Sequence, residues 1–145
     1  MKRSGRASVV VVAGVIGIVV IVFMALTSGE SPMTVGNRFM VALAAGDTNT
    51  LADISIMGDK SRDEMKKEWE KTVTASKHFL FKYRVKSFEQ PGPDQAAVPV
   101  AVERNLNPMG GSYDENYQIP LVKKDGKWKV DVLAMNRTMY PWLPR

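Results

Sequence analysis

The chain has 145 residues, 45% of them hydrophobic, with 20 basic and 15 acidic side chains. It contains no cysteine and a single histidine, so it forms no disulfide bond and any metal site would need carboxylate ligands. Three basic residues, Lys2, Arg3 and Arg6, lie in the first six positions. The net charge of +5 therefore overstates how basic the rest of the chain is.

Residues 7–28 form an uncharged, mainly apolar stretch. About 20 apolar residues span a bilayer core roughly 30 Å thick, so this stretch is long enough to cross a membrane. A secretory signal usually has an apolar part of only about 7–15 residues, followed by a small-residue cleavage site, and no clear A-x-A site follows here. We therefore expect a retained single-pass transmembrane helix, with a cleaved signal as the alternative.

The basic tail of residues 1–6 predicts the orientation of this helix. Positive residues stay on the cytoplasmic side, so we expect an inner-membrane protein with a cytoplasmic N-terminus and a periplasmic domain from residue 29. Ala13, Gly14 and Gly17 form a small-residue face on which another membrane helix could pack closely, although such residues are also common in membrane spans generally. The span carries no ionisable residue, so we do not expect an ion or proton pathway in it.

Residues 29–135 are predicted to be one domain that begins with three helices. Ser31-Pro32 is a helix start, apolar residues then recur at helical spacing, and Gly46 ends the helix. A short helix is expected over residues 50–57. Ser61-Arg62-Asp63-Glu64 is a capping-box sequence, and the helix after it places Met65, Trp69 and Val73 on one face.

From residue 78 the apolar period changes to two, which predicts strands. The expected strands cover residues 79–85, 98–102, 117–123 and 128–134, with residues 106–116 as a loop and Pro99 at an edge or bulge. Asp125-Gly126 is a two-residue hairpin turn, and counting back from it pairs Leu121 with Val130 and Ile119 with Val132. Strands that follow helices in this way predict an antiparallel sheet and an α+β fold.

Two segments resemble a known fold family. FMVALAAGDTNTLADI (residues 39–54) is similar to the first helix and Gly-Asp break of the nuclear transport factor 2 (NTF2)-like family, whose cone-shaped fold includes ketosteroid isomerase. KKDGKWKVDVL (residues 123–133) resembles the closing hairpin of that family. The resemblance covers about residues 33–135 and implies three helices packed on a curved antiparallel sheet. A membrane anchor before such a domain also resembles an inner-membrane assembly protein of type IV secretion systems.

Enzymes with this fold place proton-transferring side chains inside the cone. Asp53 and Tyr83 are the candidates for inward polar groups, but each is equally compatible with an ordinary surface or core position. His78 is isolated, and no nucleophile or phosphate-loop motif is present. We therefore predict no catalytic residue, no cofactor, no metal and no small-molecule substrate. Lys82, Arg84 and Lys86 form a basic stripe that could meet an acidic partner or lipid phosphates, or simply face solvent.

Residues 136–145 form a C-terminal tail rich in aromatic residues and proline. The tail either packs on its own domain or docks on a partner, because Tyr and Trp often dominate interfaces. We predict partner contacts at Met109, Tyr140, Trp142 and Leu143, and expect that deleting residues 139–145 leaves the domain folded.

These features together predict a non-catalytic accessory subunit of a bacterial-type membrane complex. A bioenergetic complex, photosynthetic or respiratory, is the expected host. The predicted partners are membrane lipid and other subunits, and nucleic acid is not expected in the periplasm. The alternatives are an assembly factor of a secretion system, which predicts self-association, and an NTF2-like ligand binder or enzyme, which predicts polar groups converging inside the cone.

Overall fold

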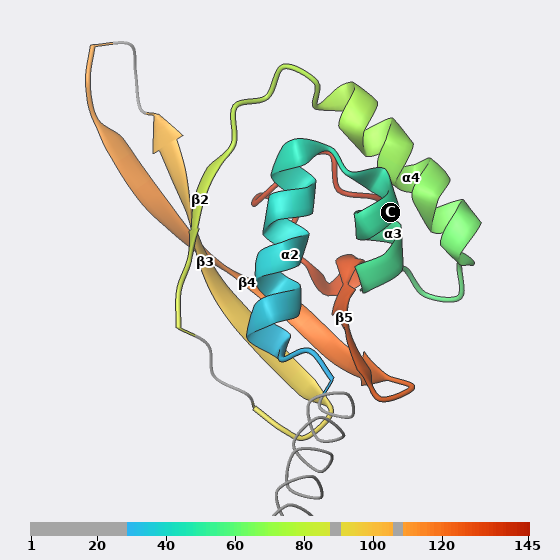
Figure 1. Cartoon of the computed structure of the whole chain (residues 1–145). Coiled ribbons are helices and arrows are strands. Elements are labelled where there is room, and N and C mark those ends of the chain that lie inside the picture. Colours follow the sequence, from blue (N-terminus) through green and yellow to red (C-terminus); the bar gives the residue numbers. More distant parts are fainter. Residues whose placement is uncertain (1–28, 88–90, 106–108) are drawn as a thin grey trace, which may run out of the picture.

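The computed structural model describes residues 29–87, 91–105 and 109–145. Within them, helices α2 (Pro32–Ala45), α3 (Thr48–Ile54) and α4 (Arg62–Ala75) lie on one side of a five-stranded sheet (Figure 1). None of the helices in this part of the chain is both long enough and apolar enough to cross a bilayer. The predicted membrane helix of residues 7–28, including Ala13, Gly14 and Gly17, lies outside the described residues.

Helix α2 begins and ends where the sequence predicts. The Ser31 hydroxyl accepts a hydrogen bond from the backbone N–H of Thr34 at 3.2 Å, and Pro32 occupies the first turn, where its missing N–H leaves no bond unmade. Gly46 ends the helix at a φ of +70°, which glycine adopts without steric cost. The buried face of α2 contacts β3, β4 and β5.

Helix α3 covers residues 48–54 instead of the predicted 50–57. It begins earlier because the Asp47 carboxylate caps it, accepting a hydrogen bond from the backbone N–H of Thr50 at 3.1 Å. It ends earlier because Ser55 and Ile56 form strand β1 (Ser55–Ile56), which pairs in parallel with the last strand. The sheet is therefore mixed, whereas the sequence predicted a purely antiparallel one.

The capping box of helix α4 is present in full. The Ser61 hydroxyl accepts from the backbone N–H of Glu64 at 3.3 Å, and the Glu64 carboxylate accepts from the backbone N–H of Ser61 at 2.7 Å. Met65 and Trp69 face the core as predicted. The third buried residue of the helix is Thr72, not Val73.

The sheet has the order β1-β5-β4-β3-β2. Strands β2 (Lys82–Val85), β3 (Gln95–Asn105), β4 (Ser112–Lys124) and β5 (Lys127–Asp131) are antiparallel neighbours. Strand β4 begins at Ser112, so the predicted loop of residues 106–116 was too long. Residues 112–116 pair with residues 101–105, and the resulting hairpin of β3 and β4 projects past the helices (Figure 1).

The turn between β4 and β5 is confirmed. Asp125 and Gly126 have φ angles of +52° and +75°, the combination that a two-residue type I′ hairpin requires. The predicted pair Leu121–Val130 is present, but the predicted pair Ile119–Val132 is wrong. After β5 the chain turns into a 3₁₀ helix, η1 (Val132–Ala134), so Val132 is buried without a partner on β4.

Pro99 lies within β3 and opposite Gln118 of β4. The pairing of β2 with β3 ends at Val85, and the next residue, Lys86, donates its backbone N–H to the Pro99 carbonyl at 2.8 Å. Because the N and O atoms of one residue face the same neighbour in an antiparallel pair, the proline nitrogen faces the side where β2 ends. This is locally an edge position, as predicted, and no hydrogen bond to β4 is lost.

Candidate functional site

The inner face of the sheet, which the helices cover, is apolar and filled. Five inward side chains of β3 and β4 are at most 1% exposed: Val98, Val100, Val102, Ile119 and Leu121. Four equally buried helix side chains belong to the same core: Phe39, Met40, Leu51 and Trp69. These nine apolar side chains offer packing contacts to whatever lies on them.

The C-terminal segment, residues 136–145, completes this core. Met139 is 1% exposed, and Tyr140 and Leu143 are each 4% exposed. Trp142 is half-buried against the same cluster. Of the two alternatives for the tail, the structure therefore shows packing on its own domain, and Tyr140 and Leu143 present no surface to a partner. Deleting residues 139–145 would remove core side chains, contrary to our expectation that the shortened domain stays folded.

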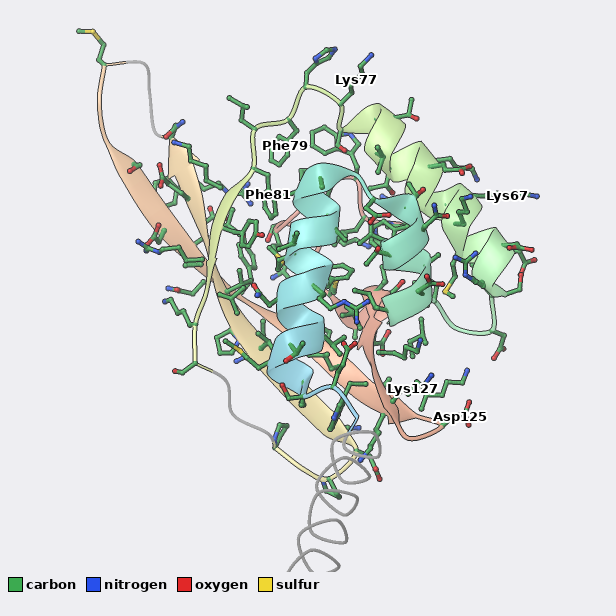
Figure 2. The ribbon with its side chains drawn as sticks, in the orientation of Figure 1. Lys67, Lys77, Phe79, Phe81, Asp125 and Lys127 are labelled. Carbon is green, nitrogen blue, oxygen red and sulfur yellow. The ribbon has the colours of Figure 1, made fainter. Side chains whose placement is uncertain are left out.

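Aromatic rings and backbone contacts both hold the segment in place. The Phe79 ring centroid lies 5.4 Å from that of Tyr140 and 4.9 Å from that of Trp142, in edge-to-face geometry. Phe79 is labelled in Figure 2, in the stretch that leads from α4 into β2. The Thr72 hydroxyl of α4 donates to the Trp142 carbonyl at 2.7 Å, and the Arg137 guanidinium donates to the carbonyls of residues 143 and 144 at 2.9 and 2.7 Å.

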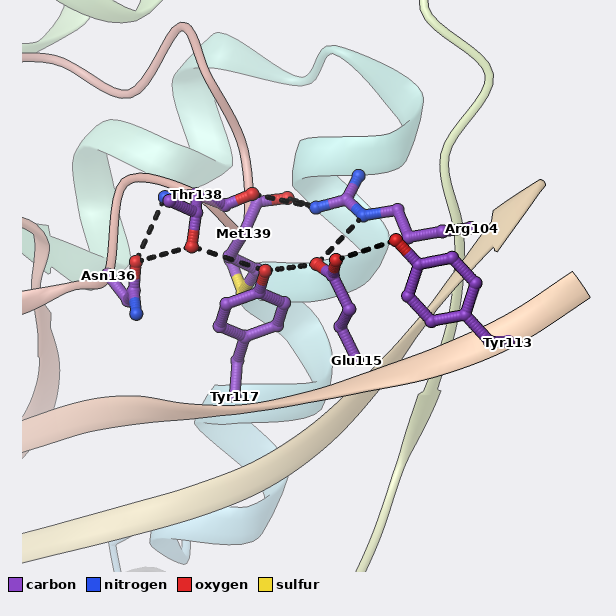
Figure 3. A network of polar contacts seen from close by, with 7 residues as sticks. All are labelled: Arg104, Tyr113, Glu115, Tyr117, Asn136, Thr138 and Met139. Carbon is purple, nitrogen blue, oxygen red and sulfur yellow. Dashed lines mark hydrogen bonds and ion pairs between the residues drawn. The ribbon is translucent and has the colours of Figure 1, made fainter. Parts of the chain in front are cut away.

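A polar network lies where the inner face continues beyond the apolar core (Figure 3). Arg104 of β3 donates to the Glu115 carboxylate of β4 at 3.1 Å. The same guanidinium donates to the carbonyl oxygens of Thr138 and Met139 at 2.7 and 3.0 Å. Arg104 therefore ties the C-terminal segment to the sheet.

Two tyrosines complete the network around Glu115. Tyr113 donates to one carboxylate oxygen at 3.1 Å, and Tyr117 donates to the other. The Tyr117 oxygen also lies 3.2 Å from the Thr138 hydroxyl, which donates to it. Together with Arg104, three donors thus converge on one carboxylate.

This arrangement stabilises the charged form of Glu115. Hydrogen bonds from Tyr117 first, and then from Arg104, hold the pKa of the Glu115 carboxyl below its usual value, and they outweigh the opposing effect of desolvation. The same carboxylate raises the pKa of the Tyr113 hydroxyl. A carboxylate that already accepts from three donors is a weak proton acceptor, so the geometry of this network suits holding the segment better than acid–base catalysis.

The sequence interpretation missed this network. It assigned residues 106–116 to a loop because Pro108, Gly110 and Gly111 are strong turn signals. The strand signal was nevertheless present, since Tyr113, Glu115 and Tyr117 continue the two-residue period of Ile119 and Leu121. Because Glu115 is charged, it interrupts this apolar pattern. Without that interruption the pattern starts at Tyr113, four residues before the predicted strand start at Tyr117.

Asp53 and Tyr83, the predicted candidates for inward polar groups, are not brought together. Asp53 lies on α3, half exposed, and forms an ion pair with Arg62; the hydrogen bond from Arg62 lowers the pKa of its carboxyl. Its carbonyl accepts from Lys129 of β5. Tyr83 lies on β2, at the opposite edge of the sheet, packs beside Phe81, and has its pKa raised by burial. His78 is exposed, and among the described residues no three potential metal ligands cluster.

The basic stripe of β2 lies on the outer face of the sheet, the face opposite the helices. Lys82 pairs with Glu103 of the neighbouring strand β3 at 3.7 Å. Arg84 pairs with Asp114, and Lys86 donates to Asn116 at 2.5 Å, both on β4, the strand beyond β3. The carboxylates of Glu103 and Asp114 neutralise the charges of Lys82 and Arg84, whereas the Asn116 amide is neutral and leaves Lys86 charged. The stripe is therefore not a concentrated positive surface.

The candidate contact points in the described part of the chain include two hollows and one exposed tip. A hollow of about 560 Å³ lies on the outer face, next to Pro99, Gln118 and Pro120. Another, of about 260 Å³, lies near the start of the described chain and is lined by Gly29, Arg38, Asp53, Lys127 and Lys129 among others. Met109, predicted as a partner contact, is 94% exposed beside the turn between β3 and β4.

Comparison with solved structures gives similar folds. A protein from Thiobacillus denitrificans, assigned as a calcium/calmodulin-dependent protein kinase type II association domain, matches with a TM-score of 0.51 and 10% identity, over 70% of this chain and 90% of that one. A ketosteroid isomerase-like protein from Erwinia carotovora atroseptica matches with a TM-score of 0.44 and 18% identity, over 66% and 85%. A Campylobacter jejuni protein assigned as an NTF2-like transpeptidase matches with a TM-score of 0.45 and 20% identity, over 70% and 98%.

No protein-family model and no curated protein matched the chain. At the identities found among solved structures, the likeness concerns the fold alone. The helices, the order of the strands and the closing hairpin agree with the α+β cone that the sequence resembles. The described domain has an NTF2-like, ketosteroid-isomerase-like fold.

Proposed function

We propose that this protein acts by contact, as a non-catalytic accessory subunit of a larger membrane complex. Residues 7–28 would anchor it, and the domain from residue 29 would brace neighbouring subunits. One observation carries the proposal: the space between helices and sheet, where enzymes with this cone-shaped fold place their proton-transferring side chains, is filled by the chain's own C-terminal segment. Met139, Tyr140 and Leu143 occupy that space and are at most 4% exposed.

The polar groups at the edge of this space support the same proposal. Arg104 donates to two backbone carbonyls of the C-terminal segment, and Glu115 accepts from Arg104, Tyr113 and Tyr117. Each group is used to hold the chain to itself. A catalytic site would instead direct donors or acceptors at a substrate.

The projecting hairpin of β3 and β4 supplies a suitable contact element. Its two strands continue past the helical layer (Figure 1), and Met109 next to its turn is 94% exposed. Methionine is flexible and polarisable, which suits it to irregular apolar surfaces on a partner. We therefore keep Met109 as the proposed partner contact, whereas Tyr140 and Leu143 serve the domain's own stability.

Purification of the full-length protein from its native membranes in mild detergent tests the proposal. We expect a defined set of other membrane subunits in constant ratio to this chain. Electron-transfer or light-harvesting subunits would support a bioenergetic host complex, and secretion subunits would support the assembly-factor alternative. Recovery of the chain alone, with no partner, would contradict the proposal.

A matched pair of variants tests the contact itself. Met109→Asp should lower the amount of co-purified partner. Leu80→Asp is the control, because it changes a similarly exposed apolar residue, 90% exposed, that is not part of the hairpin. Asp53→Asn and Tyr83→Phe should leave the function of the assembled complex unchanged. Loss of function in either of these two variants, in a folded and complex-bound protein, would favour the ligand-binding alternative.

A further inference from the structure

The turn between β4 and β5 carries a concentration of basic side chains. Three exposed lysines flank Asp125-Gly126, and a half-buried one follows on β5; we call these four residues the lysine hairpin: Lys123, Lys124, Lys127 and Lys129. Within the described part of the chain, Lys124 and Lys127 form no ion pair, whereas Lys71 pairs with Glu68 at 2.8 Å. Asp125 is the only acidic residue in the hairpin sequence 123–129.

The lysine hairpin lies where the described chain begins. A side-chain carbon placed on Gly29 would be 3.6 Å from the carbonyl oxygen of Gly126. Figure 1 shows the start of the described chain beside the turn between β4 and β5. Residue 29 directly follows the apolar stretch of residues 7–28. If that stretch crosses the membrane, the lysine hairpin lies at the bilayer surface.

The charges around the hairpin are not balanced locally. Lys129 packs near Lys127 and Arg38, with Asp53 and Glu30 as the acidic groups facing it, and Arg38 and Asp53 each have a partner of their own, Glu30 and Arg62. Burial first, and then the charge of Lys127, lower the pKa of the Lys129 ammonium. The positive potential at this end of the domain therefore favours an anionic partner.

We propose that the lysine hairpin docks on the anionic phosphate headgroups of the bilayer that residues 7–28 span. This inference rests on the anchor of the proposed function. Each lysine near an anionic surface favours contact by about 1 kcal/mol, roughly fivefold in the equilibrium. The attraction falls off over about 8 Å at physiological salt, so it selects residues beside the membrane. Docking would hold the domain in one orientation and present the β3–β4 hairpin to neighbouring subunits.

Lysine reactivity in nanodiscs tests the proposal with internal controls. The full-length chain is incorporated into nanodiscs of phosphatidylcholine alone or with phosphatidylglycerol, and the acetylation rate of each lysine is measured by mass spectrometry. Lys67 and Lys77 of the α4 region serve as controls, because both lie away from Lys127, Lys77 at the opposite end of the domain (Figure 2). Neutral nanodiscs shield the hairpin sterically in the same way, so the difference between the two lipids isolates the effect of charge.

We expect acetylation of Lys124 and Lys127 to be at least about threefold slower in anionic nanodiscs than in neutral ones, and this difference to disappear at about 0.5 M salt. Lys67 and Lys77 should react equally in both. In Lys124→Gln/Lys127→Gln, Lys123 should lose its protection. In Lys67→Gln/Lys71→Gln, which removes the same charge from α4, the protection of the hairpin should remain.

The outcomes separate this inference from the proposed function. Equal reactivity of the hairpin lysines in both lipids, or protection that salt does not reduce, would overturn headgroup docking and leave the anchor intact. Failure of the chain to enter nanodiscs at all would overturn the anchor and, with it, the docking proposal.

Discussion

Replacing Met139 by alanine tests whether the C-terminal segment is part of the core. Met139 is 1% exposed and belongs to the same cluster as Phe39, Trp69 and Val98. The substitution removes most of a buried side chain and leaves a cavity among residues that other contacts hold in place. If the segment were a detachable tail, the same change would have little effect on stability.

The expected magnitude follows from this burial. Met→Ala changes at fully buried positions lower the free energy of unfolding by about 2–5 kcal/mol. For a domain of this size, each kcal/mol corresponds to roughly 3–6 °C in melting temperature. Met139→Ala should therefore melt about 6–30 °C below the unchanged protein.

Met109→Ala is the matched control, because it makes the same chemical change at a side chain that is 94% exposed. Surface substitutions usually change stability by less than about 0.5 kcal/mol. Thermal unfolding of the full-length variants in detergent, followed by tryptophan fluorescence, gives both values. Equal melting temperatures for Met139→Ala and Met109→Ala would refute the assignment of the segment to the core.

Three further changes probe the turn, the packing of α2 and the polar network. Gly126→Val should destabilise the domain by about 1–2 kcal/mol, because φ at this residue is +75°. Gly92→Val is the control, because a side-chain carbon there would have open space around it. Equal melting temperatures for the two variants would argue against the turn. A side-chain carbon on Gly36 would lie 2.9 Å from a Val98 methyl. Gly36→Ala should therefore lower the free energy of unfolding by about 1–3 kcal/mol, and adding Val98→Ala should partly restore it. A double variant no more stable than Gly36→Ala would contradict this contact. Because the pKa of Glu115 is lowered on folding, the stability that its carboxylate contributes is complete above its ordinary pKa of 4.5 and is lost as pH falls below that value. Glu115→Gln should therefore lose less melting temperature on acidification than the unchanged protein. Identical pH profiles for the two proteins would exclude a stabilising role of the Glu115 carboxylate.

Local signals determined much of the domain. Ser31-Pro32, the capping box at Ser61 and the Asp125-Gly126 turn each act through hydrogen bonds or backbone angles within four residues, so the sequence alone predicts them. The two-residue apolar period identified the inward side chains of β3 and β4. The order of helices and strands then sufficed for the α+β class and for the resemblance to the NTF2-like cone.

What remained depends on contacts between residues far apart in the chain. Strand β1 exists because Ser55 and Ile56 reach the backbone of β5, and no local pattern in so short a segment predicts such pairing. The start of β4 was missed because Glu115 is charged. A charged residue is favourable on this face only because Arg104 and two tyrosines donate hydrogen bonds to its carboxylate. The role of the C-terminal segment was likewise open, since aromatic residues bury themselves equally well in a partner or in their own domain. The tertiary structure decided it: Phe79, Phe81 and the apolar inner face of the sheet already lie within reach of Tyr140 and Trp142, and contact within one chain costs no association entropy.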